Sequence, residues 1–265
     1  MSSELLANPA MDVTALAQAE QAKSIEQVRA AFLMAKKFPR DEDIASHKIR
    51  TACKRLSLAQ VALYRYPRGG QNVTGPSIRL AETIVQYWGN IDCGVRELEQ
   101  RPGESVVEAY CHDLETNMRS NRVWTVKHSI QTRGGEKRLT DPRDIYEKIA
   151  NEGSRRLRAC ILAVIPGFIV EEAREECEKT LKSGGKDKPL SDRIRNMIHS
   201  FTSLGVTKEM IEARLKHAVE SMTADELSDY IAIYTSLNDK MSKTSDWFDI
   251  EVSKQQNINE ILGIT

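Results

Sequence analysis

The stretch IDCGVRELEQRPGESVVEAYCHDLETNMRSNRVWTVKH, residues 91–128, decides the fold of this chain. In it, apolar side chains alternate with polar ones, for example at Ile91 and Cys93, and this period of two is typical of a strand with one buried face. Clusters of turn-forming residues at 101–104 and 115–117 divide the stretch into three parts. We therefore predict a three-stranded antiparallel β-meander.

On both sides of the meander, apolar residues recur at helical spacing instead. The best-defined helix spans 141–165, because Asp141 can cap its N-terminus and Pro142 suits the first helical position. Its apolar stripe, which includes Leu157 and Ile161, would hold it against the sheet. Further helices are predicted at residues 12–38, 41–64, 76–88 and 169–181, with a loop at 64–72.

The C-terminal part of the chain has the pattern of a small helical unit. The composition of residues 183–189 is that of a linker, the pattern at 223–226 is a capping box, and Trp247 and Phe248 are expected to fold back on the helices. The fold class predicted is α+β, with a helical N-terminus, a meander packed on a long Arg-rich helix and a C-terminal helical module. The predicted divisions are a core at 1–182, a linker at 183–189, a module at 190–250 and a mobile tail at 251–265.

The charge of the chain is unevenly distributed, although its net value is zero. Residues 36–168 hold 23 Lys and Arg against 16 Asp and Glu, a balance of +7. Residues 1–35 have a balance of −2 and residues 169–265 a balance of −5. A basic middle between acidic ends favours a polyanion, such as a nucleic acid, as the partner of the core.

Cysteine usage and hydropathy indicate the cellular compartment. The 5 cysteines are an odd number without a C-x-x-C pair, which is typical of reduced thiols in a cytoplasmic protein. No run of about 18 apolar residues is present, and the acidic N-terminus does not have the pattern of a signal peptide. We expect a cytoplasmic protein that has no membrane partner.

The sequence lacks the motifs G-x-x-x-x-G-K-[ST], G-x-G-x-x-G, G-x-S-x-G and H-E-x-x-H, and its histidines have no metal-ligand spacing. We therefore assign no catalytic residue, no metal ligand and no cofactor. One alternative concerns Asp113 and Glu115, which are two residues apart and would share a strand face as the metal ligands of a nuclease. The other interpretation is a solvated strand face with Arg119 and Arg122 as ion-pair partners.

Two segments on predicted loops combine basic side chains with aromatic or small residues. In segment 64–72, Tyr64 and Tyr66 alternate with Arg65 and Arg68, so that the tyrosines suit stacking on bases and the arginines suit phosphates. The alternative is a surface loop whose tyrosines pack on the preceding helix. A second, hairpin-like loop at the end of the sheet is suited to a sugar–phosphate backbone, or is merely solvated. Its basic residues are Lys127, His128, Arg133, Lys137 and Arg138.

The long helix carries three arginines close together, Arg155, Arg156 and Arg158. Arg155 and Arg158 are three residues apart and therefore lie side by side, with Asn151 one turn earlier. A strip of this kind is suited to phosphate groups. The alternative is ion pairing with Glu147 and Glu152 on neighbouring turns.

The order of these elements resembles the core of phage single-strand annealing proteins of the RecT and Red-beta type. The segments that carry the resemblance are GPSIRLAE at 75–82, LTDPRDIY at 139–146 and RRLR at 155–158. In the C-terminal part, LGVT at 204–207, the segment 227–237 and Trp247-Phe248 are similar to a helical module often attached to such proteins. The resemblance covers residues 40–250.

The resemblance implies binding of single-stranded DNA and annealing to a nascent duplex without a nucleotide cofactor, in phage-type homologous recombination and DNA repair. It also implies self-assembly into rings or helical filaments through the N-terminal helices and sheet edges. The C-terminal module would bind the host single-strand-binding protein, a phage exonuclease, or both. The groove residues implied are Arg79, Lys127, Arg133, Lys137, Arg138, Arg155, Arg156 and Arg158.

Two other classes of function stay open on the sequence alone. The first is a metal-dependent DNA nuclease, or a subunit of one, in which Asp113 and Glu115 bind the metal. The second is a protein adaptor that binds its partner through the helical tail and meets no DNA. Metal-dependent loss of a labelled strand identifies the nuclease, and the absence of salt-dependent oligonucleotide binding identifies the adaptor.

Overall fold

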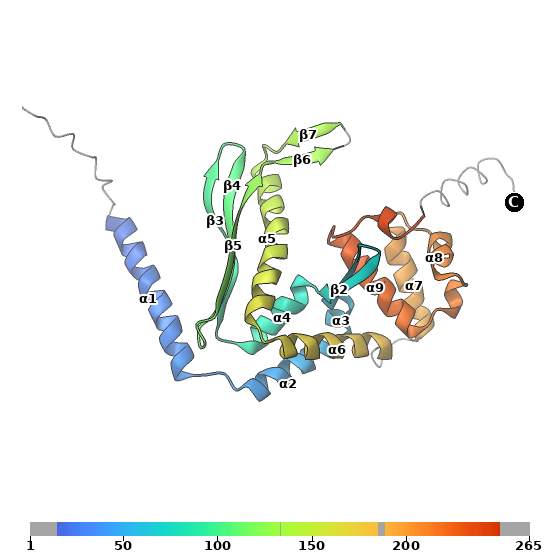
Figure 1. Cartoon of the computed structure of the whole chain (residues 1–265), viewed down its shortest axis with the longest axis horizontal. Helices are drawn as coiled ribbons and strands as arrows, with labels where there is room; N and C mark the ends of the chain where they lie inside the picture. Colours follow the sequence, from blue (N-terminus) through green and yellow to red (C-terminus); the bar gives the residue numbers. More distant parts are fainter. Residues whose placement is uncertain (1–14, 133, 185–188, 250–265) are drawn as a thin grey trace, which may run out of the picture.

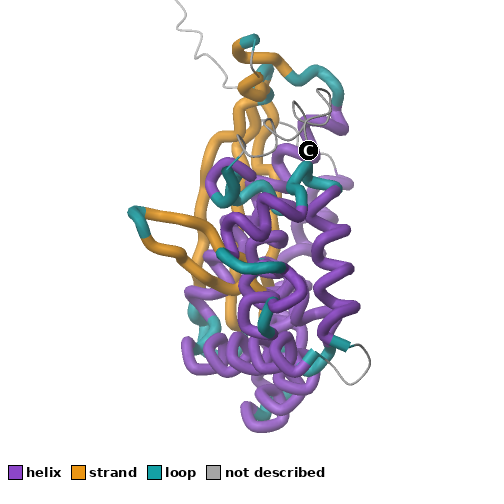
Figure 2. Tube along the Cα trace, turned by 90° about the vertical axis from the view of Figure 1, so that its right-hand side faces the viewer, coloured by secondary structure: helices purple, strands orange, loops and turns teal. Residues whose placement is uncertain are grey.

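The computed structural model describes residues 15–132, 134–184 and 189–249 and has an α+β fold. The predicted meander is confirmed as the antiparallel strands β3 (Ile91–Arg101), β4 (Glu104–Asp113) and β5 (Arg119–Lys127), with β4 in the centre. The predicted Arg-rich helix is α5 (Pro142–Val164), which runs along one face of the sheet (Figure 1). Turned by 90°, the long strands lie side by side and the helices form a separate layer (Figure 2).

Local sequence explains why α5 begins where it does and lies so close to the sheet. The side chain of Asp141 accepts a hydrogen bond from the amide of Arg143, at 2.8 Å, and Pro142 is the first residue of the helix. Gly153 is buried, and a Cβ atom there would lie 2.9 Å from Cγ1 of Val95 on β3. The missing side chain at Gly153 therefore permits the close contact between the two elements.

The N-terminal helices differ from the prediction in two places. The expected helix at 41–64 is divided into α2 (Glu42–Cys53) and α3 (Leu56–Ala62). The expected loop at 64–72 is an antiparallel hairpin of β1 (Leu63–Arg68) and β2 (Gln71–Pro76), which leads into α4 (Ile78–Trp88). Gly69 and Gly70 form its two-residue turn with φ of +58° and +80°, a conformation that glycine adopts without strain.

The first helix, α1 (Ala15–Lys37), stands away from the rest of the molecule (Figure 1). Its C-terminal end is attached, because Phe32 contacts the ring of His112 edge-on and Lys36 donates a hydrogen bond to the carbonyl of Glu115. The apolar stripe that the sequence predicts here is exposed over most of its length, with Ile25 47% and Val28 57% accessible. In the single chain, therefore, no described element packs against most of this apolar stripe.

The basic loop at 133–138 is also a hairpin, formed by β6 (Ser129–Thr132) and β7 (Gly135–Arg138) at the upper end of the sheet (Figure 1). Arg133 lies outside the described residues. No described helix is both long and apolar enough to cross a membrane.

The C-terminal part contains α6 (Gly167–Ser183), α7 (Leu190–Thr202), α8 (Lys208–Leu215) and α9 (Ala224–Asn238), with short 3-10 helices at Val219–Ser221 and Thr244–Asp246. The capping box at Thr223 and Glu226 is confirmed. Trp247 and Phe248 are buried, as predicted, and the ring of Phe248 lies 5.6 Å from that of Phe201. Residues 185–188 of the predicted linker and the tail at 251–265 lie outside the described part of the chain.

Helix α9 connects the C-terminal helices to the rest of the protein. Tyr230 and Ile233 belong to a buried cluster made with α7 and α8, whereas Ala232 belongs to the core shared by α2, α4, α5 and α6. The hydroxyl of Thr235 donates to the carbonyl of Gln60 on α3 at 3.2 Å. The division of the chain between residues 182 and 190 stays a prediction, and α9 is the helix that joins the two predicted parts.

Candidate nucleic-acid interface

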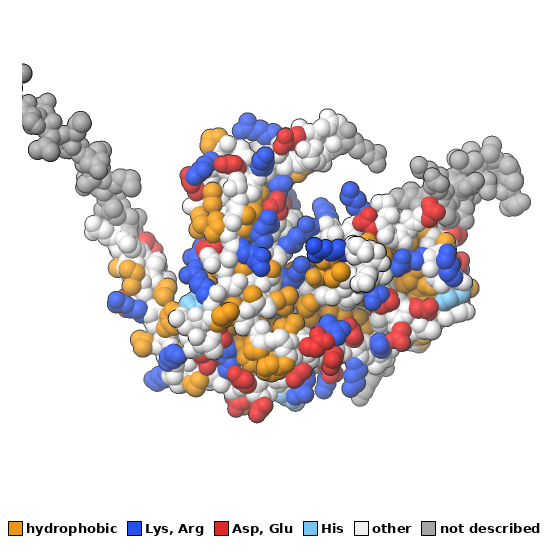
Figure 3. All heavy atoms as spheres, viewed as in Figure 1, with side chains coloured by type: hydrophobic (Ala, Val, Ile, Leu, Met, Phe, Trp, Pro, Cys, Tyr) orange, Lys and Arg blue, Asp and Glu red, His pale blue; other side chains and the backbone are white. Residues whose placement is uncertain are grey.

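The molecule is hollowed between α5 and the C-terminal helices, and Lys and Arg side chains gather on the α5 side of this hollow (Figure 3). At its base lies a cleft of about 260 Å³, whose walls come from α4, α5 and the segment that follows α9. Three of its lining residues are the predicted groove residues Arg79, Arg155 and Arg158. We call this site the arginine cleft.

One polar face of α5 forms a wall of the arginine cleft. Asn151, Arg155 and Arg158 are separated by four and three residues and therefore project from the same side of the helix, as the sequence predicts. The opposite side carries the buried Cys160, whose sulfur lies 3.5 Å from the carbonyl of Ala109 on β4. Lys148, one turn before Asn151, continues the polar face and was missed, although its spacing from Arg155 is helical.

Arg155 and Arg158 have no carboxylate partner among the described residues. Arg155 donates to the carbonyl of Lys240 at 2.8 Å, and Nη1 of Arg158 lies 3.6 Å from the sulfur of Met241. The guanidinium group of Arg158 also covers the ring of Tyr64 at 4.4 Å. Both side chains therefore keep their charge and several N–H donors for a ligand.

The alternative of ion pairing along the helix applies to a different arginine. Glu152 pairs with Lys148 at 3.6 Å and with Arg156 at 3.5 Å. Arg156 lies on the sheet side of α5, where its guanidinium group stacks over the ring of Trp124 at 4.3 Å. Arg156 is consequently absent from the arginine cleft, because it points toward β5 instead.

Two of the predicted DNA-binding arginines, one on the groove and one on segment 64–72, are bound to carboxylates that lie far away in the sequence. Arg79 donates two hydrogen bonds to Asp239, at 2.8 and 3.1 Å, and these raise the pKa of the guanidinium group. Arg65 pairs with Asp229 at 2.6 Å. Since Asp239 also lines the arginine cleft, three cations and one carboxylate face it, which leaves a balance of two positive charges.

The two tyrosines proposed to stack on bases pack on the protein. Tyr64 is only 8% exposed, lies beneath Arg158 and stacks against Tyr66 at 5.7 Å between ring centres. Tyr66 packs against the buried cluster of the C-terminal helices. Burial raises the pKa of Tyr64. Of the two interpretations of this segment, the structure shows packing, with Tyr64 beneath Arg158 of α5 and Tyr66 against the C-terminal helices.

The remaining described lysines and arginines that the sequence predicts to bind DNA are exposed and have no ion-pair partner among the described residues. Arg68 lies beside the turn of the β1–β2 hairpin. Lys127 ends β5, and Lys137 and Arg138 lie on β7 of the neighbouring hairpin, at the end of the sheet where α5 begins. These cations lie outside the arginine cleft.

The two carboxylates of the nuclease alternative are held by an arginine. Asp113 accepts a hydrogen bond from Arg40 at 2.6 Å, and Glu115 accepts one from the same guanidinium group at 2.9 Å. Arg40 takes the place of the ion-pair partners predicted from the sequence; Arg119 instead pairs with Glu108 at 3.5 Å. No group of three or more possible metal ligands occurs among the described residues. The oxygens of this pair are thus already bound to a cation.

No family model, no curated protein and no solved structure matches this chain. The likeness to phage annealing proteins therefore depends on the short segments quoted above and on the order of the elements.

Proposed function

We propose that this protein binds single-stranded DNA along the hollow between α5 and the C-terminal helices and promotes annealing without consuming a nucleotide. The observation that carries the proposal is the arginine cleft, in which Arg155 and Arg158 present guanidinium groups that no described carboxylate neutralises. Guanidinium groups on a polar helix face suit phosphates, which carry no sequence information.

The chemistry of the surface fits strand pairing better than base recognition. Because Tyr64 is buried and Tyr66 packs against the protein, the contacts would be made mainly to the sugar–phosphate chain, which leaves base edges free to pair. The free energy then comes from the new duplex, in which stacking contributes about 1.4 kcal/mol per step. The proposal includes a cytoplasmic location and contact of the C-terminal helices with a single-strand-binding protein or an exonuclease.

An annealing assay tests the proposal directly. Two complementary labelled oligonucleotides are mixed with the protein in the presence of a metal chelator and in the absence of ATP. We expect faster duplex formation, with strand affinity that falls steeply as salt rises, because bound phosphates release counterions. An unchanged annealing rate together with salt-independent or undetectable strand binding would reject the function, and shortening of the strands after magnesium is added would favour a nuclease.

Self-assembly is the second part of the proposal, and it concerns α1. Ile25 and Val28 project on the same side of this helix and are half exposed, so a second copy of the chain is the partner that would cover them. We expect Ile25→Glu/Val28→Glu to convert assemblies into single chains in sedimentation velocity. Gln27→Glu/Ala30→Glu places the same two charges on the opposite side of α1 and should assemble normally; equal behaviour of the two variants would exclude this contact.

A further inference from the structure

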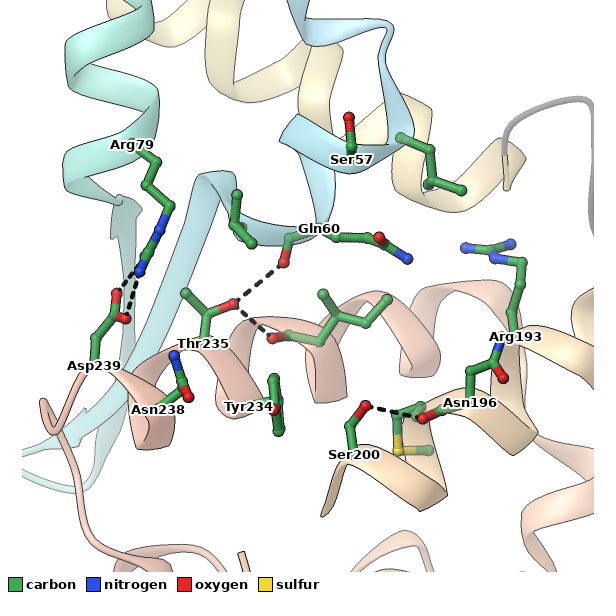
Figure 4. Close-up of a pocket in the computed structure, with 14 residues that line it drawn as sticks. Ser57, Gln60, Arg79, Arg193, Asn196, Ser200, Tyr234, Thr235, Asn238 and Asp239 are labelled. Atoms are coloured by element: carbon green, nitrogen blue, oxygen red, sulfur yellow. Dashed lines mark hydrogen bonds and ion pairs between the residues drawn. The ribbon is translucent and has the colours of Figure 1, made fainter. Parts of the chain in front are cut away.

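A second and larger pocket, of about 460 Å³, lies where α3, α7 and α9 meet (Figure 4). Arg79 and Asp239, which line the arginine cleft, line this pocket too. Their paired side chains therefore stand between the two sites. The volume of the larger pocket is within the range of sites that hold small molecules, about 300–1,000 Å³.

Arg193 is the residue that marks this pocket as a binding site. It is only 8% exposed, yet no carboxylate among the described residues pairs with it. The one hydrogen-bond partner of its side chain among the described residues is the carbonyl of Leu181, in the last turn of α6. Its guanidinium group packs so closely on Gly184 that a Cβ there has no space. Burial lowers the pKa of this arginine.

Contact with the C-terminal end of α6 gives Arg193 a structural role as well, because cations stabilise the negative end of a helix. That role uses one N–H group of the five that a guanidinium group has. A buried cation that no described carboxylate pairs with is unfavourable in the described part of the chain, and an anion placed in the pocket would relieve the imbalance. Figure 4 shows the Arg193 side chain directed across the pocket toward Gln60.

The other lining residues offer two kinds of surface. The side-chain amides of Gln60, Asn196 and Asn238 have no hydrogen-bond partner among the described residues. Each amide carries a donor and an acceptor, as the edges of nucleobases do. Apolar walls come from Leu56, Met197 and Ile231, with the ring of Tyr234 beside them, and such walls suit the face of a base.

We propose that this pocket binds one nucleoside monophosphate unit, with the phosphate on Arg193 and the base between the amides and the apolar walls. The unit is either a free nucleotide or the terminal nucleotide of a strand whose remainder lies in the arginine cleft. The second source rests on the proposed function, and the first does not. A terminal phosphate carries more charge than an internal phosphodiester, which favours a phosphorylated end.

The test uses the full-length protein and calorimetric or fluorescence titrations with thymidine 5′-monophosphate and with thymidine. We expect the nucleotide to bind and the nucleoside to bind at least about tenfold more weakly, because only the first has a partner for the buried charge. Arg193→Gln should remove the preference for the nucleotide. The matched control, Arg195→Gln, alters an exposed arginine of the same helix, which is 80% accessible, and should bind as the wild type does.

Gln60→Leu and Asn196→Leu keep the pocket testable if Arg193→Gln does not fold, because both side chains are exposed at its rim. Each should weaken binding of the nucleotide without changing the unfolding midpoint. A protein that binds the nucleotide no better than the nucleoside overturns the proposal, as does a folded Arg193→Gln variant with wild-type affinity.

Oligothymidines with a 5′-phosphate, a 3′-phosphate or neither distinguish the two sources. Tighter binding of one phosphorylated end, lost in Arg193→Gln, identifies the strand terminus; equal binding of all three, with the mononucleotide still bound, identifies a free nucleotide. If strands anneal but no mononucleotide or strand end is preferred, this inference fails and the proposed function stands. If thymidine monophosphate binds and no strand does, the proposed function fails and the pocket stands.

Discussion

Replacement of Arg40 by methionine is expected to lower the free energy of unfolding by about 3–5 kcal/mol at neutral pH, the usual effect of removing one partner from a buried ion pair. The side chain of Arg40 is 7% exposed and connects the end of α1 with the end of the sheet through Asp113, which is 5% exposed, and Glu115, which is 17% exposed. Without the guanidinium group, two carboxylates are left buried side by side. Methionine keeps an apolar stem beside Trp88, over which Arg40 lies.

The same variant should change how stability depends on pH. Burial raises the pKa of Glu115, but hydrogen bonds from Asn90 and Arg40 outweigh it and hold the pKa below its ordinary value. A lowered pKa means that Glu115 contributes stability above the unfolded value, about 4.3, and that this contribution is lost as the pH falls through the folded value. The difference between wild type and Arg40→Met should therefore be largest near neutral pH and shrink below about pH 4.

Urea unfolding at neutral pH and at about pH 3, below the unfolded value, measures both effects. Arg119→Met is the matched control, because it removes an arginine that is 48% exposed and pairs with Glu108 at 3.5 Å. Glu108 is only 8% exposed, but it keeps its pair with Arg96 at 2.8 Å, so the loss of its exposed second partner is expected to cost about 0–1 kcal/mol. A loss from Arg40→Met as small as that of the control would mean that the Arg40 pairs do not stabilise the fold.

Local signals in the sequence predicted the meander and α5 correctly. Alternation in residues 91–128 and the Asp141-Pro142 start depend only on neighbours in the chain. The division of α2 from α3 was not predicted, because apolar spacing continues across Lys54 and Arg55, where the helix ends. The β1–β2 hairpin was missed although Gly69-Gly70 is a known hairpin signal, because the proline and glycine content of the segment was interpreted as a loop.

The arginine cleft could be predicted only in part. Helical spacing placed Arg155 and Arg158 together, which needs no knowledge of the rest of the fold. The partners of Arg65 and Arg79 could not be foreseen, since Asp229 and Asp239 reach them from α9 and the residue that follows it. The packing of Tyr64 and Tyr66 likewise depends on elements distant in the sequence. The sequence thus shows which residues are basic, but it does not show which of them have no carboxylate partner in the fold.

Alanine at both Arg155 and Arg158 is expected to weaken binding of single-stranded DNA by roughly 25-fold at about 0.1 M salt. Each phosphate contact to a single strand contributes about 0.7 to the slope of log affinity against log salt, so two lost contacts make the slope shallower by about 1.4. All sequences should be affected equally, because phosphate contacts do not distinguish bases. Filter binding or fluorescence anisotropy at several salt concentrations measures both quantities.

Two further variants separate charge from structure at this site. Arg158 covers Tyr64, and loss of such a cation–π contact costs about 0.5–2 kcal/mol, so the unfolding free energy of the double variant has to be measured as well. Lysine at both positions keeps the charges and should retain the wild-type salt slope. Arg50→Ala/Arg195→Ala removes two exposed arginines from α2 and α7, away from the cleft, and should bind strands normally. If the cleft and control variants weaken binding equally, strands follow the net charge of the protein rather than the arginine cleft, and the interface proposed on α5 is wrong.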